Sequence, residues 1–218
     1  MAVTPPRPLA ESDDRNLFDC GREALNLWFR RHAWANQASG ASRVTVVTDA
    51  TSGRIVGYVT LSAAQIERAF LPKPKQRNRP DPLPVTLLGQ LAVDKDYQGQ
   101  GHAVSLLLFA LKTALNAAES IGSMGVVTHP LDDNVRGFYA RWGFQDLPFD
   151  PRRAMLVRMI DLQRVFGSEI EPRGVRSPVR DVDLNGPFQD SISHLIYAPK
   201  KPLWIRGVQH HPVRSRNN

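Results

Sequence analysis

The sequence predicts an α/β (α+β) domain over residues 1–166 and an irregular or disordered tail over residues 167–218. Three observations support this. An apolar run at residues 85–93 leads through a glycine-containing turn into a long helical pattern without Gly or Pro. Two β-branched stretches, 43–50 and 54–62, flank the turn Thr51-Ser52-Gly53, which is typical of a β-hairpin. Further short apolar stretches alternate with helical patterns up to residue 160, so we expect a sheet flanked by helices.

The individual elements follow from residue spacing. An extended lead-in at residues 1–15 precedes a helical pattern in which apolar residues recur at three- and four-residue steps. His32 lies on or beside the apolar face of this first helix, and we expect its role to be structural. We expect helices at 21–37, from the glycine turn to about 119, and from Asp132 or Asp133 to about 142, and strands at 43–50, 54–62, 85–93, 124–129 and 154–160.

Two segments read as irregular. Residues 71–82 combine four prolines with four basic residues, which predicts an exposed loop. From Gly167 onward the chain is rich in Pro, Gly, Arg and Ser and has few periodic apolar residues. We expect at most one short strand in this tail, at residues 193–197, and no contribution of the tail to the chemistry of the domain.

Composition restricts the class of protein. The hydrophobic fraction of 42% and the charged fraction of 22% are those of a soluble globular protein. The N-terminus has no apolar signal core and no apolar segment reaches membrane-spanning length, so we expect a cytoplasmic protein without a membrane partner. Cys20 is the only cysteine, which excludes an intrachain disulfide and a cysteine-based zinc site. The net charge of +7 and the pI of about 10.0 favour an anionic partner.

The turn between the strand at 85–93 and the following helix predicts a phosphate site. The first turn of a helix leaves backbone N–H groups unpaired, its dipole adds positive potential, and glycines let an anion approach the backbone. A dinucleotide fingerprint would need a third glycine where Val104 stands, and an NTPase phosphate loop would need Gly-Lys-Ser/Thr. What remains is the pattern Q/R-x-x-G-x-G/A, met by Gln98, Gly101 and Ala103.

A second motif lies downstream, at Gly137-Phe138-Tyr139-Ala140-Arg141-Trp142-Gly143-Phe144. A strand, a Q-x-x-G-x-A turn, a helix, a second strand and then F-Y-x-R-x-G-F together resemble the GNAT superfamily of acetyl-CoA-dependent N-acetyltransferases. The resemblance covers about Leu17 to Ile160. It implies a mixed central sheet of about six or seven strands with a splayed central strand, and acetyl-CoA as co-substrate.

Four further stretches are more discriminating than the glycine turn: Phe18-Asp19-Cys20-Gly21, Gln37-Ala38-Ser39-Gly40-Ala41-Ser42-Arg43, Leu91-Ala92-Val93-Asp94 and Tyr97-Gln98-Gly99. They resemble the TacT- and AtaT-like tRNA-acetylating toxins of bacterial type II toxin–antitoxin systems. This narrower resemblance implies a toxin that acetylates the α-amino group of aminoacyl-tRNA, blocks translation and is paired with a separate DNA-binding antitoxin. A homodimer stays open as the oligomeric state.

The GNAT resemblance implies roles for particular residues. Tyr139 matches the general acid, because a phenol with a pKa near 10 can protonate a thiolate whose thiol pKa is about 8–9. The chain departs from the common pattern at Asp132, where many members carry Asn, at Val135, usually Ala, and at His102-Ala103. The cofactor-binding residues implied are Leu91, Ala92 and Val93 on the central strand, and Gln98, Gly99, Gln100, Gly101, His102, Ala103, Val104 and Ser105 in the turn.

The central strand also bears on the substrate. Some family members carry a Glu there that deprotonates a lysine, whereas this chain has Gly89-Gln90-Leu91-Ala92 and no carboxylate before Asp94. Neutralising a lysine at pH 7 costs about 4–5 kcal/mol, whereas neutralising an α-amine costs only about 1 kcal/mol. The site is therefore better suited to an α-amine, such as that of aminoacyl-tRNA. The expected phosphate contacts are the basic residues of the exposed loop, Lys73, Lys75, Arg77 and Arg79.

Two other functions remain open from the sequence. One is a GNAT enzyme that acetylates a small-molecule amine or a protein N-terminus. The other is a catalytically inactive GNAT-like module that binds RNA or an antitoxin. The presence of Gln98, Gly101 and Tyr139 argues against the inactive module.

Overall fold

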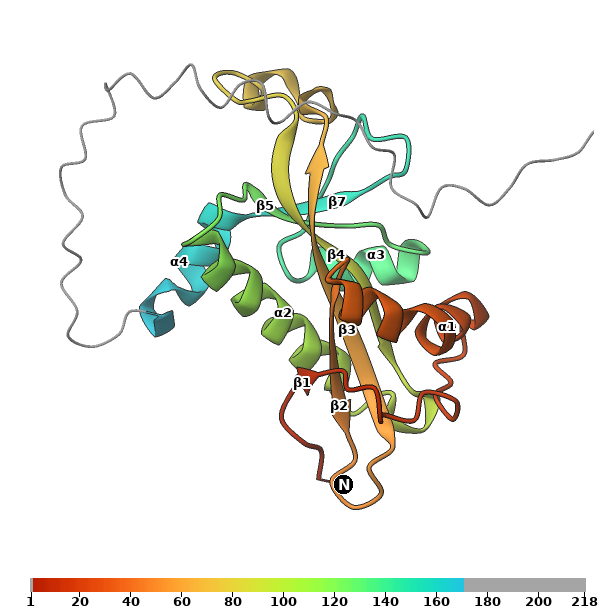
Figure 1. Ribbon diagram of the computed structural model, residues 1–218. Coiled ribbons are helices and arrows are strands. Elements are labelled where there is room, and N and C mark those ends of the chain that lie inside the picture. Colours follow the sequence, from red (N-terminus) through yellow and green to blue (C-terminus); the bar gives the residue numbers. More distant parts are fainter. Residues whose placement is uncertain (1, 171–218) are drawn as a thin grey trace, which may run out of the picture. The chain divides into compact units, whose positions relative to one another are not determined.

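The computed structural model describes residues 2–170. Within them, seven strands form one mixed sheet in the order β1-β2-β3-β4-β5-β7-β6 (Figure 1). β4 and β5 run parallel, and the other neighbouring strands are antiparallel. This sheet confirms the predicted fold class. The strands are β1 (Arg7–Pro8), β2 (Arg43–Thr48), β3 (Ile55–Ile66), β4 (Leu83–Val93), β5 (Gly125–Thr128), β6 (Gln145–Asp146) and β7 (Met155–Arg158).

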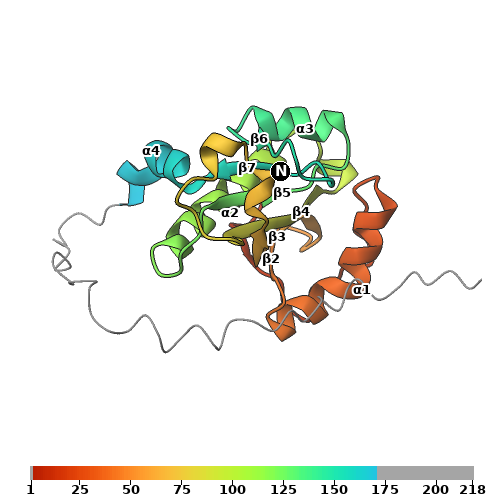
Figure 2. The ribbon, with the colours of Figure 1, turned by 90° about the horizontal axis from the view of Figure 1, so that it is seen from above.

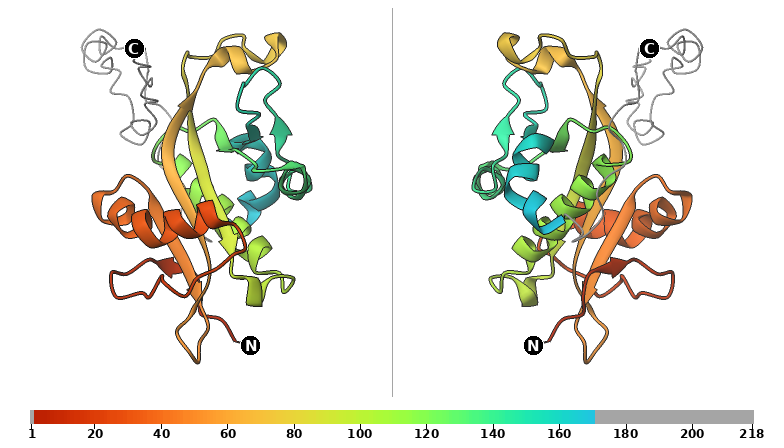
Figure 3. Two further views of the ribbon diagram at one scale, coloured as in Figure 1. Left: turned by 90° about the vertical axis from the view of Figure 1, so that its right-hand side faces the viewer. Right: turned by 90° about the vertical axis from the view of Figure 1, so that its left-hand side faces the viewer.

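Helices cover both faces of the sheet. The α-helices within residues 2–170 are α1 (Glu23–Ser39), α2 (His102–Ala118), α3 (Asp133–Ala140) and α4 (Met159–Ile170). Figures 2 and 3 show α1 on one side of the β3–β4 hairpin, and α2 with α4 on the other. Successive residues of β3 serve the two layers: Tyr58 stacks on Phe29 of α1 with ring centroids 4.1 Å apart, whereas Val59 packs in the α2 cluster.

The central strand is splayed, as expected. β4 pairs with β5 only through Thr86 and Leu87, and its residues 88–93 pair with β3 alone or not at all. A bulge accompanies the splay, because Thr60 pairs with Gln90 while Leu61 pairs with Leu88, which leaves Gly89 without a partner. The Gln90 N–H donates instead to the Thr60 hydroxyl oxygen at 2.9 Å.

The lead-in and the connection between β3 and β4 hold more structure than expected. Arg7 and Pro8 pair with β2, and Arg7 donates two hydrogen bonds to the carboxylate of Asp13, at 2.8 and 2.7 Å. The segment between β3 and β4 contains two 3₁₀ turns, Arg68–Phe70 and Lys73–Lys75. A third, Lys95–Tyr97, follows β4. Among residues 2–170, no helix is long and apolar enough to span a membrane.

The predicted strand at 154–160 is wrong at its C-terminal end. β7 stops at Arg158 and α4 begins at the next residue. Met159 and Leu162 recur at a helical step and are both buried, and Arg158 holds Asp161 three residues further on at 2.6 Å. The expected boundary at residue 166 therefore falls inside α4. The expected tail beyond residue 170, with its strand at 193–197, lies outside the described residues.

Candidate active site

A cleft opens where β4 and β5 separate. Its volume is about 260 Å³, and its walls come from the start of α1, from β4, from the end of β5 and from α3. Residues predicted from separate parts of the sequence line it together: Leu91, Ala92, Val93, Gln98 and Tyr139. The expected pantetheine-binding strand and the expected general acid therefore share one cavity.

The free edge of β4 can accept an extended ligand as an added strand. The Asp94 N–H donates to the Val56 carbonyl at 2.8 Å, so the alternating antiparallel ladder directs the backbone groups of Ala92 towards β3. The backbone groups of Leu91 and Val93 then point away from β3, into the cleft. Of the three strand residues named from the sequence, Leu91 and Val93 thus offer backbone hydrogen bonds, and Ala92 offers surface only.

The glycine turn presents an open helix start. Gly99 and Gly101 have φ values of 74° and 85°, and a Cβ at either position would meet no atom within 4 Å. Gly101 caps α2 without a side-chain hydrogen bond, so the first-turn N–H groups, at His102, Ala103 and Val104, have no helical acceptor. Gln100 and Ser105 are exposed beside them. Space and unpaired donors coincide here, which suits a pyrophosphate.

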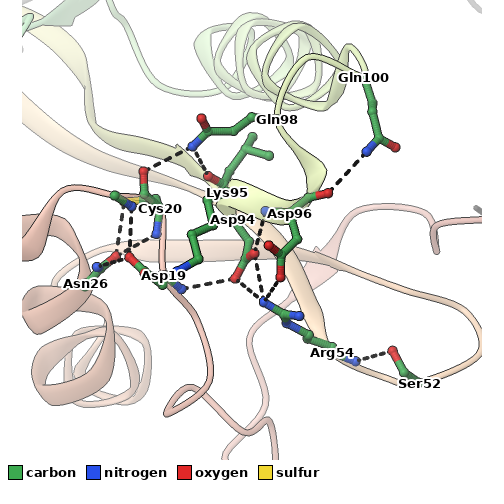
Figure 4. A network of polar contacts seen from close by, with 12 residues as sticks. Asp19, Cys20, Asn26, Ser52, Arg54, Asp94, Lys95, Asp96, Gln98 and Gln100 are labelled. Carbon is green, nitrogen blue, oxygen red and sulfur yellow. Dashed lines mark hydrogen bonds and ion pairs between the residues drawn. The ribbon is translucent and has the colours of Figure 1, made fainter.

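Gln98 is exposed at the cleft, and its amide binds neighbouring backbone groups. Its side-chain N–H groups donate to the carbonyl oxygens of Cys20, at 3.1 Å, and Val93, at 2.9 Å (Figure 4). The side chain thus ties the glycine turn to the end of β4 and to the segment before α1. We assign Gln98 to positioning the turn, and the Val93 carbonyl is already occupied by it.

A buried carboxylate joins two sequence motifs that lie far apart. The Asp94 side chain is fully buried and accepts hydrogen bonds from Arg54, at 2.9 and 3.0 Å, and from the backbone N–H of Asp19 at 3.1 Å (Figure 4). Lys95 contacts the Asp19 carboxylate at 2.8 Å. That hydrogen bond, with those from Gly21 and Asn26, holds the pKa of Asp19 below its usual value. The motifs at 18–21 and 91–99 therefore form one structural unit.

Tyr139 lies in the last turn of α3. Its ring is 4% exposed and packs between Phe138 and Phe144, with centroids 5.3 and 5.2 Å away. Burial raises the pKa of its phenol to about 12, against a hydrogen bond with Thr128 that lowers it. A core role for the ring and a proton-holding role for the hydroxyl are therefore compatible. Asp132 caps α3 by accepting the Val135 N–H at 2.9 Å, as the sequence predicted for one of the two aspartates.

The cleft contains polar residues that the sequence did not single out. Arg22 precedes α1 and reaches Asp132 at 2.6 Å, and His129 follows β5. Gln90 accepts a hydrogen bond from Tyr58 at 2.8 Å. Arg22 and Asp132 are 110 positions apart, so no local pattern signals their pairing. Within residues 2–170, no cluster of His, Cys, Asp and Glu side chains could hold a metal ion.

The basic loop does not join this cleft. It lies before the start of β4, whereas the glycine turn follows the end of β4, so the two are at opposite ends of that strand (Figure 1). Lys73, Lys75 and Arg77 are exposed and Arg79 is partly buried. Lys75 donates to the Gln145 side chain at 3.3 Å. Any contact of this loop with a substrate must be made by a part of the substrate remote from the glycine turn.

Known proteins resemble this chain in sequence and in structure. The family model described as an acetyltransferase (GNAT) domain matches residues 40–146. A tRNA-acetylating toxin of Mycobacterium tuberculosis is 38% identical over 162 residues, which are 74% of this chain and 96% of that protein.

Two solved structures extend the likeness. AtaT complexed with acetyl-methionyl-tRNAfMet has a TM-score of 0.70 and 31% identity, covering 76% of this chain and 99% of that chain. A mutant AtaT toxin bound to the C-terminus of the antitoxin AtaR and to acetyl-CoA has a TM-score of 0.65 and 26% identity, covering 75% and 98%.

Proposed function

The chain belongs to the GNAT acetyltransferases and to the group that includes tRNA-acetylating toxins, and we propose that it acetylates the α-amino group of aminoacyl-tRNA with acetyl-CoA and so blocks translation. One observation carries this proposal. The free edge of β4 and Tyr139 line one cleft, and Gln98, which precedes the glycine turn and the open N-terminus of α2, lines it with them. Acetylation of the α-amine removes the nucleophile of peptide bond formation, which is why such an enzyme is toxic.

The residues present fit acetyl-CoA as a substrate. The backbone groups of Leu91 and the N–H of Val93 pair with the pantetheine amides, and the first turn of α2 binds the pyrophosphate through its N–H groups. Gly99 and Gly101 leave the room that two phosphates need. The thioester then lies beside Tyr139, whose buried phenol keeps its proton at any physiological pH and gives it to the departing thiolate.

The acceptor side of the cleft favours an α-amine over a lysine. Between Gly89 and Val93 the wall of β4 offers no carboxylate that could act as base. Arg22 lines the cleft and pairs with Asp132 at 2.6 Å, and its remaining N–H groups can donate to the phosphates of a tRNA acceptor end. Lys73, Lys75, Arg77 and Arg79 are proposed to contact a more distant part of the tRNA.

A toxin of this kind requires a partner that restrains it. AtaT is bound by the C-terminus of its antitoxin AtaR in one solved structure. We propose that this chain likewise has a cognate antitoxin, a separate DNA-binding protein, and that it acts in the cytoplasm, where aminoacyl-tRNA is found.

The experiment that tests the proposed function uses purified protein, acetyl-CoA labelled in the acetyl group, and bulk aminoacyl-tRNA. Transfer of label to RNA-linked amino acid is expected from the parent protein. The matched control is Tyr139→Phe, which keeps the ring and removes the proton. Label transfer to a small amine or to a protein N-terminus, with none to RNA, would replace the proposal by the small-amine function.

A further inference from the structure

His129 and Asp150 lie close together, and neither has a role in the function proposed above. His129 follows β5 and lines the cleft that holds Tyr139, and its neighbour Thr128 is the residue that hydrogen-bonds Tyr139. Asp150 lies in the loop between β6 and β7, and its side chain is fully buried. The His129 Nε2 atom and the Asp150 Oδ2 atom are 3.8 Å apart. Both atoms are buried and neither has a hydrogen-bond partner.

The arrangement selects one tautomer of the imidazole. Asp150 Oδ1 accepts the backbone N–H of Arg152 at 2.9 Å, so its other oxygen is left to face Nε2. A proton on Nε2 points at this carboxylate, whereas a lone pair there would oppose it. Nδ1 then carries the lone pair. Because Nε2 is buried while 31% of the side chain is exposed, the accessible part of the ring is the part away from Asp150.

Resting on the proposed function, we propose that His129 is the general base that takes a proton from the substrate α-ammonium, and that Asp150 is the positioning residue that holds its tautomer. His129 stands on the cleft wall opposite the free edge of β4, where no carboxylate is available. It therefore supplies the group that the central strand of this chain lacks. Asp150 stabilises the imidazolium that forms, as a buried carboxylate does behind other catalytic histidines.

The charges around the ring keep it ready to accept a proton. Burial lowers the pKa of His129, the positive charge of Arg152 lowers it further, and Asp150 opposes both. Arg22 and Asp132 pair with each other at the start of α1 and α3, and Tyr139 is uncharged. The imidazole is consequently neutral near pH 7, which a base requires.

The proton transfers of the reaction need no group other than His129, Tyr139 and water. His129 takes one proton from the ammonium, directly or through one water. The amine then forms the C–N bond as the C–S bond of the thioester breaks. Tyr139 gives its proton to the thiolate and recovers one from the nitrogen through water. His129 finally releases its proton to solvent, so that the products are the amide, the free thiol of CoA and one proton.

The test is the pH dependence of acetylation in the variants His129→Gln and Asp150→Asn, with His32→Gln as control. His32 is exposed on α1 and outside the cleft. In the parent, kcat/KM for aminoacyl-tRNA should stay level from about pH 6.5 to 9. In His129→Gln only the free amine reacts, so the acid limb should move up to the amine pKa of about 7.7–8.0. This gives a loss of about 15- to 30-fold at pH 6.5 and less than about twofold at pH 9.

Asp150→Asn separates the positioning role from packing. Its oxygen stays on the Arg152 N–H, so its NH₂ group faces Nε2 and drives the proton of His129 to Nδ1. The acid limb should then move as in His129→Gln, while His32→Gln keeps the parent profile. Initial rates are corrected for spontaneous deacylation of the tRNA. An equal loss at every pH, or no loss in either variant, overturns the proposal.

Nitrogen NMR of the histidine rings tests the tautomer of His129 independently of activity. The parent should show the His129 proton on Nε2, and Asp150→Asn should show it on Nδ1. If the parent acetylates no aminoacyl-tRNA, the proposed function fails, whereas the tautomer reports on the His129–Asp150 pair alone. A parent protein with the proton on Nδ1 contradicts the inference even where the enzyme is active.

Discussion

Replacing Tyr139 with Phe removes one oxygen and separates catalysis from packing. The ring is buried between Phe138 and Phe144, so the variant keeps the core contacts and creates no cavity. What is lost is the hydrogen bond with Thr128. Because Thr128 is buried, removing its partner lowers the free energy of unfolding by about 1–3 kcal/mol. The variant should therefore fold and melt cooperatively, slightly below the parent.

The expected fall in kcat is too large to result from this loss of stability, because the variant stays folded under assay conditions. General acid catalysis contributes about 10²–10⁴-fold. kcat for acetylation of aminoacyl-tRNA should fall by about that factor. The affinity for acetyl-CoA, measured by calorimetry, should not change, because the proposed binding groups are backbone groups of β4 and α2. A loss in kcat of under about threefold refutes the assignment, since general acid catalysis is worth far more.

The raised pKa of Tyr139 gives a second readout. As the proposed general acid the phenol acts when protonated, so acetylation should show no alkaline decline up to about pH 9. Because the folded-state pKa lies above the unfolded value of about 10, the neutral phenol stabilises the fold fully below pH 10. This contribution is lost as the pH rises from about 10 towards 12. The additional alkaline loss of stability should be absent in Tyr139→Phe, as pH-dependent urea unfolding can show.

Three further outcomes are expected. Gly101→Glu places a carboxylate in the open space at the start of α2 and should abolish acetyl-CoA binding in calorimetry, and unchanged affinity in a folded variant would contradict the turn assignment. A chain that ends at Ile170 should fold and acetylate as the full chain does, because the cleft residues all precede that position, and insolubility would show that the boundary is wrong. Alanine at all four basic positions of the β3–β4 loop, Lys73, Lys75, Arg77 and Arg79, should weaken acetylation and leave acetyl-CoA binding unchanged. The salt dependence of acetylation should become flatter by about one unit of slope per lost phosphate contact. An unaltered salt dependence would mean that the loop is a solvated linker.

The fold could be predicted from the sequence because its signals are local. The hairpin at residues 43–62 and the strand-turn-helix at 85–118 depend on β-branched runs, glycine turns and helical spacing within short windows. α4 was missed for the same reason. Its first residues continue the apolar run of β7, and only the recurrence of Met159, Leu162 and Phe166 distinguishes a helix there. β1 was missed because two residues carry no periodicity, and their strand conformation is imposed by β2.

The same reasoning explains which half of the site could be predicted. The proposed cofactor-binding groups lie in one contiguous stretch from Leu91 to Ser105, so a local sequence pattern can indicate them. The acceptor side is assembled from the start of α1, the end of β5 and the β6–β7 loop. His129 and Asp150 are separated by β6 and α3, and nothing in the residues beside either one indicates the other. A pair made only by tertiary packing has no local sequence pattern. The sequence of β4 therefore shows that this strand carries no glutamate to act as base, but it does not indicate that His129 lines the same cleft.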